Sequence, residues 1–106
     1  MKGERNRKRY ILFDIISNKE IIPASLEKTV LNTISRNFGE LGVTESKILL
    51  LKELYKKNHG IFVTTNNFVA KLKFVFGLIK KIDDNEVIIT TKKVYGTLKK
   101  FKRGGS

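Results

Sequence analysis

Residues 61–82 read IFVTTNNFVAKLKFVFGLIKKI, a β-type run followed directly by a helical pattern. Residues 61–65 are β-branched or aromatic, a composition that suits a pleated, half-buried strand. Asn66 or Asn67 is expected to cap the helix that follows. Apolar residues then recur at helical spacing and predict one core-facing stripe: Phe68, Leu72, Val75, Phe76, Ile79 and Ile82. Phe74 and Leu78 lie off this stripe, one turn apart, and either pack at its rim or contact another subunit.

The chain before this stretch also predicts a strand and then a helix. Residues 10–16 are a compact apolar run whose alternation sets Asp14 on one, partly exposed face. The opposite face should point into the core: Ile11, Phe13 and Ile15. We expect a helix of about four turns to follow, with Ser25 as its N-cap and apolar residues at every fourth position. Gly39 and Gly42 can end that helix.

Residues 46–57, SKILLLKELYKK, are ambiguous. Leu, Lys and Glu favour a helix by intrinsic propensity. The continuous apolar run at 48–51 and a turn at 58–60 that leads straight into the next strand favour a hairpin instead. We therefore predict a strand over 46–57. Further on, residues 83–85 should form a turn and residues 86–92 the last strand.

The predicted order is β-α-β-β-α-β with a basic extension. Each helix has a single apolar stripe, so both helices must cover one face of a four-stranded antiparallel sheet. This is the ferredoxin-like, split β-α-β-β-α-β sandwich of the α+β class. We divide the chain into a basic N-terminal arm at 1–9, a ferredoxin-like domain at 10–92 and a basic C-terminal extension at 93–106.

Composition narrows the classes of function. The chain has 106 residues, 41% of them apolar, which suits one globular domain with its own core. It has no cysteine, which excludes disulfides and thiolate chemistry and agrees with a reducing cytoplasm. The apolar run at 10–16 is too short and too polar for a signal peptide or a membrane span. We therefore expect a cytoplasmic protein with no membrane partner.

The net charge of +12 is concentrated at the two ends of the chain. Residues 1–9 contain five basic residues and one acid, and no acid follows Glu86. If the fold brings the ends together, they form one basic surface that fits a polyanion. The predicted RNA-binding residues are Arg5, Arg7, Lys8, Arg9, Tyr10, Lys92, Lys93, Lys99, Lys100, Lys102 and Arg103. Tyr10, Tyr95 and Phe101 could stack on bases, although Phe101 could equally pack a short helix onto the sheet.

Few residues suggest catalysis. His59 is the only histidine, and its spacing reveals no orienting partner, so we interpret it as a turn residue. Asp83, Asp84 and Glu86 could suggest a magnesium site, but acidic turns are common and we expect no metal here. Residues 61–65 lack the alternating aromatics of the RNA-recognition motif, which argues against base stacking on the open sheet. We predict no catalytic residues in the chain.

Three short motifs run in order along the chain. They are RKRYILFDI at residues 7–15, Gly60-Ile61 at the entry to a central strand, and Gly96-Thr97-Leu98 followed by two lysines. Together they resemble the archaeal and eukaryotic ribonuclease P protein component 2 family over nearly the whole chain. That family has a ferredoxin-like fold, which agrees with the order predicted above.

The resemblance implies a non-catalytic subunit of ribonuclease P, the endonuclease that removes the 5′ leader from precursor tRNA. In that family the RNA subunit performs the hydrolysis with Mg²⁺, and the protein binds this RNA together with a TIM-barrel-like protein subunit. Contact with precursor tRNA is then indirect, and a homodimer within the complex is compatible with the sequence. Phe74 and Leu78 are our candidate contact with the TIM-barrel-like subunit.

Other classes remain open at this point. A ribosomal or general structured-RNA-binding protein of the same fold would show similar affinity for unrelated RNAs. A ligand-sensing ferredoxin-like module would leave the +12 charge unexplained. A self-contained nuclease would need a catalytic constellation that the sequence does not display.

Overall fold

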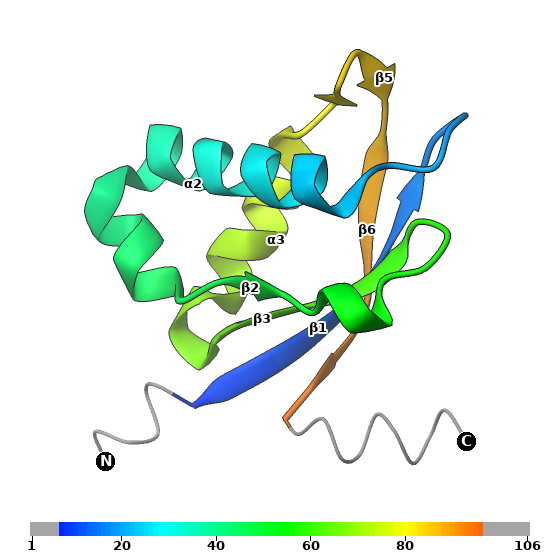
Figure 1. The fold of residues 1–106 in the computed structure, drawn as a ribbon. Helices are drawn as coiled ribbons and strands as arrows, with labels where there is room; N and C mark the ends of the chain where they lie inside the picture. The colour runs from blue at the N-terminus through cyan, green and yellow to red at the C-terminus, as the bar shows by residue number, and fades with distance from the viewer. Residues whose placement is uncertain (1–6, 97–106) are drawn as a thin grey trace.

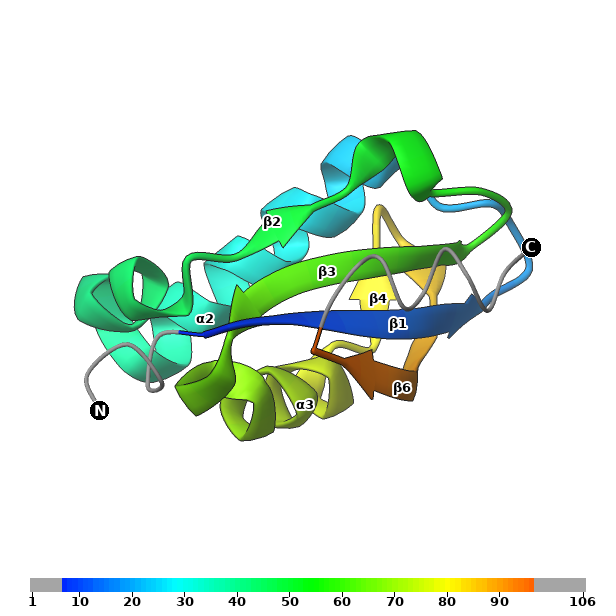
Figure 2. The same cartoon turned by 90° about the horizontal axis from the view of Figure 1, so that it is seen from below.

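β1 (Lys8–Ile16) is one of the two central strands of the sheet in the computed structural model, which describes residues 7–96. β1 pairs antiparallel with β3 (His59–Thr65) on one side and with β6 (Ile88–Tyr95) on the other. β2 (Leu49–Leu50) pairs antiparallel with β3 and completes the order β2-β3-β1-β6. Figure 2 shows β3, β1 and β6 side by side. The predicted four-stranded antiparallel sheet is confirmed.

Helices α2 (Pro23–Ser46) and α3 (Val69–Leu78) pack against each other and against this sheet (Figure 1). One core cluster joins both helices to alternate residues of β1, so both helices cover the same face. The core-facing set predicted on β1 is buried: Ile11, Phe13 and Ile15. The residues predicted as the stripe of the second helix are buried as well, but α3 begins at Val69 and ends at Leu78, so Phe68, Ile79 and Ile82 lie outside the helix that was expected to carry them. The buried set is Phe68, Leu72, Val75, Phe76, Ile79 and Ile82. The ferredoxin-like class is therefore confirmed.

Three phenylalanine rings hold the two central strands against α3. The ring of Phe13 lies 5.1 Å from that of Phe62 and 6.0 Å from that of Phe76, measured between centroids. Gly60 lets these rings approach the backbone of β3, because an added Cβ there would lie 3.0 Å from Phe13 and 2.8 Å from Tyr55. Only glycine therefore fits this entry to β3 without a shift of its neighbours.

Helix α2 differs from the prediction at both ends. Its N-cap is Ile22 and Pro23 opens its first turn, so the prediction of Ser25 as N-cap is wrong. Gly39 interrupts the helix with φ 72° and ψ −177°, as the sequence predicted, but the chain then returns to helix and continues to Ser46. Gly42 does not end the helix. It is buried in the second segment, where an added Cβ would clash with the Cβ of Phe38.

The strand predicted over 46–57 forms only at β2. The following residues make the 3-10 turn η1 (Lys52–Leu54), and all three of its side chains are exposed. An extended conformation would not bury these side chains and so would gain no free energy from burial. The intrinsic preference of Lys, Glu and Leu for helical backbone therefore decides the local conformation. The hairpin turn itself has Lys57 and Asn58 at positive φ and closes with a bridge between Lys56 and His59.

Neither Asn66 nor Asn67 caps a helix, so that prediction is wrong. Both lie inside the 3-10 turn η2 (Asn66–Phe68), which precedes α3 and has Thr65 as its N-cap. The chain bends into η2 directly after β3, one residue earlier than expected, and the N-caps of η2 and α3 make no side-chain cap hydrogen bond.

The last part of the predicted sheet divides in two. β4 (Lys81–Ile82) and β5 (Asn85–Glu86) form a small separate hairpin. Asp83 and Asp84 occupy its turn at φ 51° and 66°, which confirms the predicted turn. β6 then begins at Ile88 rather than at residue 86 and runs three residues past the predicted end at residue 92. β1 likewise begins two residues before the predicted start at residue 10.

Candidate nucleic-acid interface

Within residues 7–96, the first and last described parts of the chain meet in the sheet. The first half of β1 pairs with the last half of β6, so that Tyr10 lies opposite Tyr95 and Leu12 opposite Lys93. A Cβ added at Gly96 would lie 3.9 Å from Nη1 of Arg9. Five described basic residues therefore belong to one surface, which we call the basic end: Arg7, Lys8, Arg9, Lys92 and Lys93.

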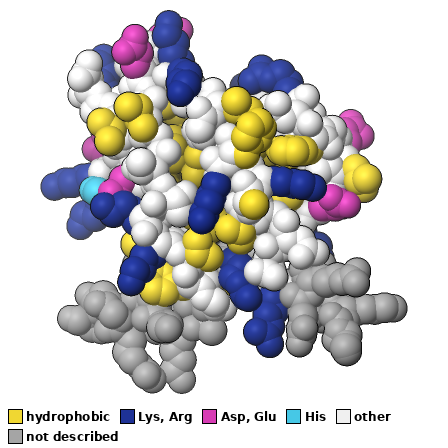
Figure 3. All heavy atoms as spheres, turned by 180° about the vertical axis from the view of Figure 1, so that it is seen from behind, with side chains coloured by type: hydrophobic (Ala, Val, Ile, Leu, Met, Phe, Trp, Pro, Cys, Tyr) yellow, Lys and Arg dark blue, Asp and Glu magenta, His cyan; other side chains and the backbone are white. Residues whose placement is uncertain are grey.

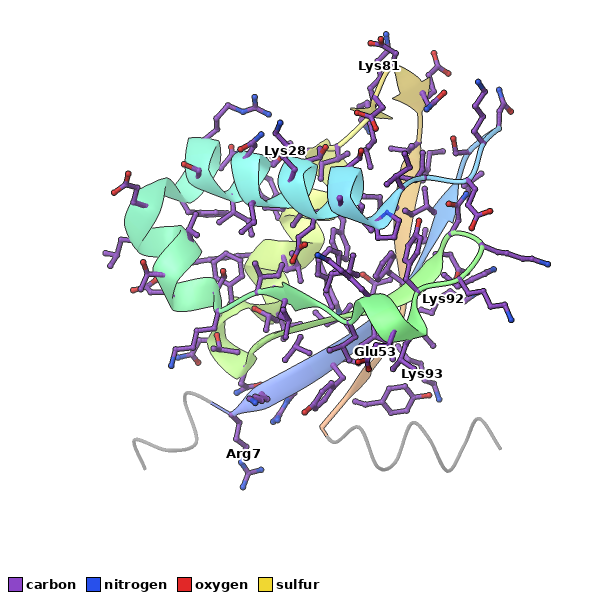
Figure 4. The ribbon with its side chains drawn as sticks, in the orientation of Figure 1. Arg7, Lys28, Glu53, Lys81, Lys92 and Lys93 are labelled. Atoms are coloured by element: carbon purple, nitrogen blue, oxygen red, sulfur yellow. The ribbon has the colours of Figure 1, made fainter. Side chains whose placement is uncertain are left out.

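Figure 4 shows Arg7 and Lys93 at the lower end of the molecule and Lys28 and Lys81 at the opposite, upper end. All members of the basic end are exposed except Arg9, which is partly buried. The predicted joining of the chain ends is thus present in the residues that the structure describes. Five predicted RNA-binding residues, Arg5, Lys99, Lys100, Lys102 and Arg103, lie outside the described residues, as does Phe101.

A β-bulge brings Lys92 to the face of the sheet that points away from the helices. The register between β1 and β6 shifts between Leu12 and Phe13, which leaves Lys92 as the extra residue. Its Nζ lies 3.3 Å from Oδ2 of Asp14. A surface ion pair of this kind contributes little to stability, at most about 1 kcal/mol, but it does fix the direction of the lysine side chain.

Asp14 also contacts His59, which lies directly opposite it on β3. Nδ1 of His59 forms a short hydrogen bond with Oδ1 of Asp14. The Thr90 hydroxyl donates to the Asp14 carbonyl oxygen at 3.4 Å. The interpretation of His59 as a turn residue without an orienting partner is therefore wrong, because His59 opens β3 and the antiparallel register supplies Asp14. We call Asp14, His59 and Lys92 the sheet-face cluster.

The charge of Asp14 is set by these contacts. Partial burial raises the pKa of its carboxyl, but hydrogen bonds and positive charge from His59 and Lys92 outweigh this effect. The net pKa therefore lies below its usual value, and Asp14 stays ionised at neutral pH. Its side chain is 21% exposed, against 64% for His59 and 55% for Lys92, so the two cationic groups reach past it into solvent.

An apolar patch lies on the helical side of the molecule. Phe74 is 54% exposed and Leu78 is 42% exposed, which confirms that both lie off the core stripe of α3. The ring of Phe74 packs edge-on against Phe38 at 6.3 Å, and Leu41 on the second segment of α2 is 69% exposed. Nζ of Lys71 lies 5.4 Å from the centroid of the Phe38 ring. Seen from behind, apolar side chains form several groups with Lys and Arg between them, while Asp and Glu stay near the margins (Figure 3).

The described residues offer little for metal chemistry. Across residues 7–96 no three His, Asp or Glu side chains gather to hold a metal ion. Asp83 and Asp84 instead occupy the β4–β5 turn. Within the same residues no helix is long and apolar enough to cross a membrane. The surface of the described residues includes an open hollow of about 500 Å³ beside Ile16, Ile88 and Lys81 and another of about 430 Å³ beside Lys47, Asn67 and Lys71.

The fold and the basic end together define a small ferredoxin-like α+β domain with a positively charged end to its sheet. The model of the Rpp14/Pop5 family matches residues 9–104, and the chain belongs to this family. The resemblance found in the three sequence motifs is therefore confirmed.

Two relatives are named ribonuclease P protein component 2. The one from Pyrococcus furiosus is 33% identical over 99 residues, which cover 93% of this chain and 82% of the relative. The one from Sulfurisphaera tokodaii is 31% identical over 105 residues, which cover 96% and 81%. A chain in the cryo-EM structure of yeast ribonuclease MRP superposes with a TM-score of 0.70 over 95% of this chain and 92% of its own length. At 11% identity, this last likeness supports the fold alone.

Proposed function

We propose that this chain is a non-catalytic protein subunit of ribonuclease P, which binds and stabilises the enzyme's RNA for 5′-leader removal from precursor tRNA. The observation that carries the proposal is the basic end, assembled from residues 7–9 and 92–93, in a chain related to ribonuclease P protein component 2. The chemistry then belongs to the RNA and its Mg²⁺ ions, and the protein itself holds no cofactor.

The proposed mechanism is electrostatic. A folded catalytic RNA crowds phosphates together, and Mg²⁺ ions or basic side chains must neutralise them. Lys and Arg that contact phosphates release condensed counterions, which makes the binding strong at low salt and weak at high salt. Such contacts position the partners rather than read a base sequence. The basic end should therefore lower the Mg²⁺ concentration that the RNA needs for activity.

We assign the exposed pair Phe74 and Leu78 to the contact with the TIM-barrel-like protein subunit. A large exposed aromatic beside an exposed leucine is the usual composition of a protein contact rather than of an RNA contact. The pair lies on α3, whereas the basic end lies on β1 and β6. This separation would let the chain bind RNA and the second protein at the same time.

The deciding experiment is precursor-tRNA cleavage at limiting Mg²⁺, with ribonuclease P RNA and the TIM-barrel-like subunit, in the presence and absence of this chain. We expect cleavage to rise when the chain is added and the Mg²⁺ requirement to fall. A lack of stimulation, together with equal affinity for unrelated structured RNAs, would replace the proposal with a general RNA-binding protein of the same fold. Cleavage by the protein alone would contradict the non-catalytic role.

A further inference from the structure

Side chains from three strands meet on the sheet face that points away from the helices. They are Asp14 from β1, His59 from β3 and Lys92 from β6. Asp14 accepts a hydrogen bond from each neighbour, with Oδ1 toward Nδ1 of His59 and Oδ2 at 3.3 Å from Nζ of Lys92. One carboxylate therefore holds two cationic side chains that are far apart in the sequence.

The ring contact decides which atom of His59 can meet a ligand. Because Nδ1 faces Asp14, Nε2 is the ring nitrogen left for another partner. The His59 side chain is 64% exposed, so this nitrogen is accessible to a large ligand. When the ring is protonated, Nε2–H and the Lys92 ammonium are two cationic donors side by side. This is a donor set for an oxyanion.

The charged surroundings of His59 favour an anion over a cation. Asp14 on β1 and Lys92 on β6 are its charged neighbours across the sheet, and Lys56 pairs with it across its own hairpin. Asp14 is the one acid in this set, and it is shared between His59 and Lys92. A protonated His59 therefore leaves the sheet-face cluster with a net positive charge.

The sheet-face cluster lies on the same face as part of the basic end. Tyr10, Leu12 and Asp14 alternate along one face of β1, and their partners on β6 are Tyr95, Lys93 and Thr90. Asp14 is four residues along β1 from Tyr10, which is about 13 Å in an extended strand. A nucleic-acid strand that meets the basic end could thus continue across this face to His59.

We infer that His59 and Lys92, oriented by Asp14, form a second RNA phosphate-binding site on the sheet face, which shares Lys92 with the basic end. This inference rests on the proposed function, because it needs ribonuclease P RNA as the partner. Asp14 is a positioning residue that does not touch the RNA itself. The alternative is an ion-pair network that only joins three strands, and this alternative predicts a change in stability without a change in RNA affinity.

The test compares the full chain with His59→Gln for binding to ribonuclease P RNA at pH 6 and pH 8, at one fixed salt concentration. Glutamine can still donate to Asp14 but never carries a charge. Histidine is the side chain type whose charge ordinarily changes between pH 5 and pH 8, and His59 is the only histidine in the chain. We expect the wild-type chain to bind more tightly at pH 6 than at pH 8. The variant should lose most of this gain, with affinity at pH 6 roughly fivefold lower than wild type.

Two further variants complete the design. Lys28→Ala removes one positive charge from the far side of the molecule and should keep the full pH response (Figure 4). Asp14→Asn should weaken the pH response by freeing both cationic side chains, and circular dichroism checks that it folds. If His59→Gln keeps the wild-type pH response, the second site is refuted while the proposed function stands. If wild-type chain shows no preference for ribonuclease P RNA over unrelated RNAs, both the site and the proposed function are refuted.

Discussion

At the residue scale, Asn58 and Tyr55 join the β3 hairpin to the segment between β1 and α2. Asn58 takes φ 65°, a left-handed conformation that asparagine tolerates better than most residues. Its Oδ1 accepts from the Ile21 N–H at 2.7 Å, and its Nδ2 donates to the Lys19 carbonyl at 3.0 Å. The Tyr55 hydroxyl donates to the Ile21 carbonyl at 2.6 Å. These hydrogen bonds join side chains of the hairpin to backbone groups some 35 positions earlier in the chain, so the partly buried polar groups on both sides have partners.

The Tyr55 hydroxyl leads to a prediction about alkaline stability. Burial, followed by the nearby Glu20 carboxylate, raises the pKa of Tyr55 to about 12. The folded state therefore keeps this proton at a pH where the unfolded chain, with a tyrosine pKa of about 10, has lost it. We expect the contribution of Tyr55 to be complete below about pH 10 and to decline between about pH 10 and pH 12.

Tyr55→Phe keeps the ring beside Phe13 and removes only the hydroxyl. It should lower the free energy of unfolding by about 1 kcal/mol at pH 7, because one partly buried hydrogen bond is lost. The stability advantage of wild type over the variant should shrink as the pH rises above 10 and reverse as the pH nears 12, because only wild type carries the ionising hydroxyl. Urea denaturation at pH 7, 10 and 11.5 measures both effects, and a wild-type advantage that grows with pH would contradict the assignment.

At the element scale, two glycines in helices have opposite roles. Gly39 interrupts α2 at φ 72° and ψ −177°, a region that is essentially restricted to glycine. Gly77 lies inside α3 with ordinary helical backbone. A Cβ added at either position has no neighbouring atom within 4 Å. Neither added Cβ would therefore clash, and the two positions differ only in backbone conformation.

Replacement of each glycine by alanine should therefore change stability in opposite directions. Gly39→Ala should destabilise the fold by roughly 1–3 kcal/mol, because alanine at this φ and ψ is strained. Gly77→Ala should stabilise it by roughly 0.5–1 kcal/mol, because alanine loses less backbone entropy in a helix. Thermal unfolding of the two variants beside wild type serves as the check. A higher melting temperature for Gly39→Ala would show that the interruption of α2 carries no strain, and a lower one for Gly77→Ala would contradict the entropy argument at that position.

The exposed face of α3 supplies a second prediction at this scale. Phe74→Glu together with Leu78→Glu should abolish binding to the TIM-barrel-like subunit, since two exposed apolar side chains become charged. Both positions already tolerate solvent, so the fold should be retained. Ile22→Glu is the control, because Ile22 is also an exposed apolar residue, at 60%, but it lies at the start of α2, whereas Phe74 contacts Phe38 further along that helix. Unchanged affinity of the double variant, measured by calorimetry, would reject this face as the contact.

The sequence predicted elements wherever burial follows a regular period. Apolar alternation in β1 and helical spacing over residues 68–82 each predicted which side chains face the core. Every residue of both predicted sets is buried. Prediction failed where conformation depends on tertiary context, as in residues 52–54, or on a cap one residue away, as at Asn66. The contact between Asp14 and His59 was also missed. It depends on the register of two strands whose partners are 45 residues apart, which no local pattern reports.

At the scale of the whole molecule, the topology of the sheet places the basic end apart from other lysines of the chain. Pairing of β1 with β6 gathers the described ends of the chain, whereas Lys28 and Lys81 lie at the far end of the molecule (Figure 4). The sequence predicted one basic surface only if the fold placed the two ends of the chain side by side. The strand order β2-β3-β1-β6 does so for the described residues.

Two double variants with the same loss of charge test the basic end. Arg7→Ala with Lys93→Ala should weaken binding of ribonuclease P RNA. It should make the slope of log affinity against log salt concentration shallower by up to about two, one for each lost phosphate contact. It should also raise the Mg²⁺ concentration needed for cleavage. Lys28→Ala with Lys81→Ala should leave both quantities near wild type. Equal effects of the two pairs would mean that only net charge matters, and that the basic end is no distinct interface.

The pairing of β1 with β6 also bears on how the protein is made. β1 leaves the ribosome before every other strand of the sheet, yet one of its two neighbours comes from residues 88–95. Contacts between such distant parts of a chain form late and slow the folding of a domain. A nascent chain that has not reached residue 88 can pair β1 with β3 but cannot add the β6 side of the basic end. The surface proposed to bind RNA is therefore complete only once synthesis of the sheet is complete.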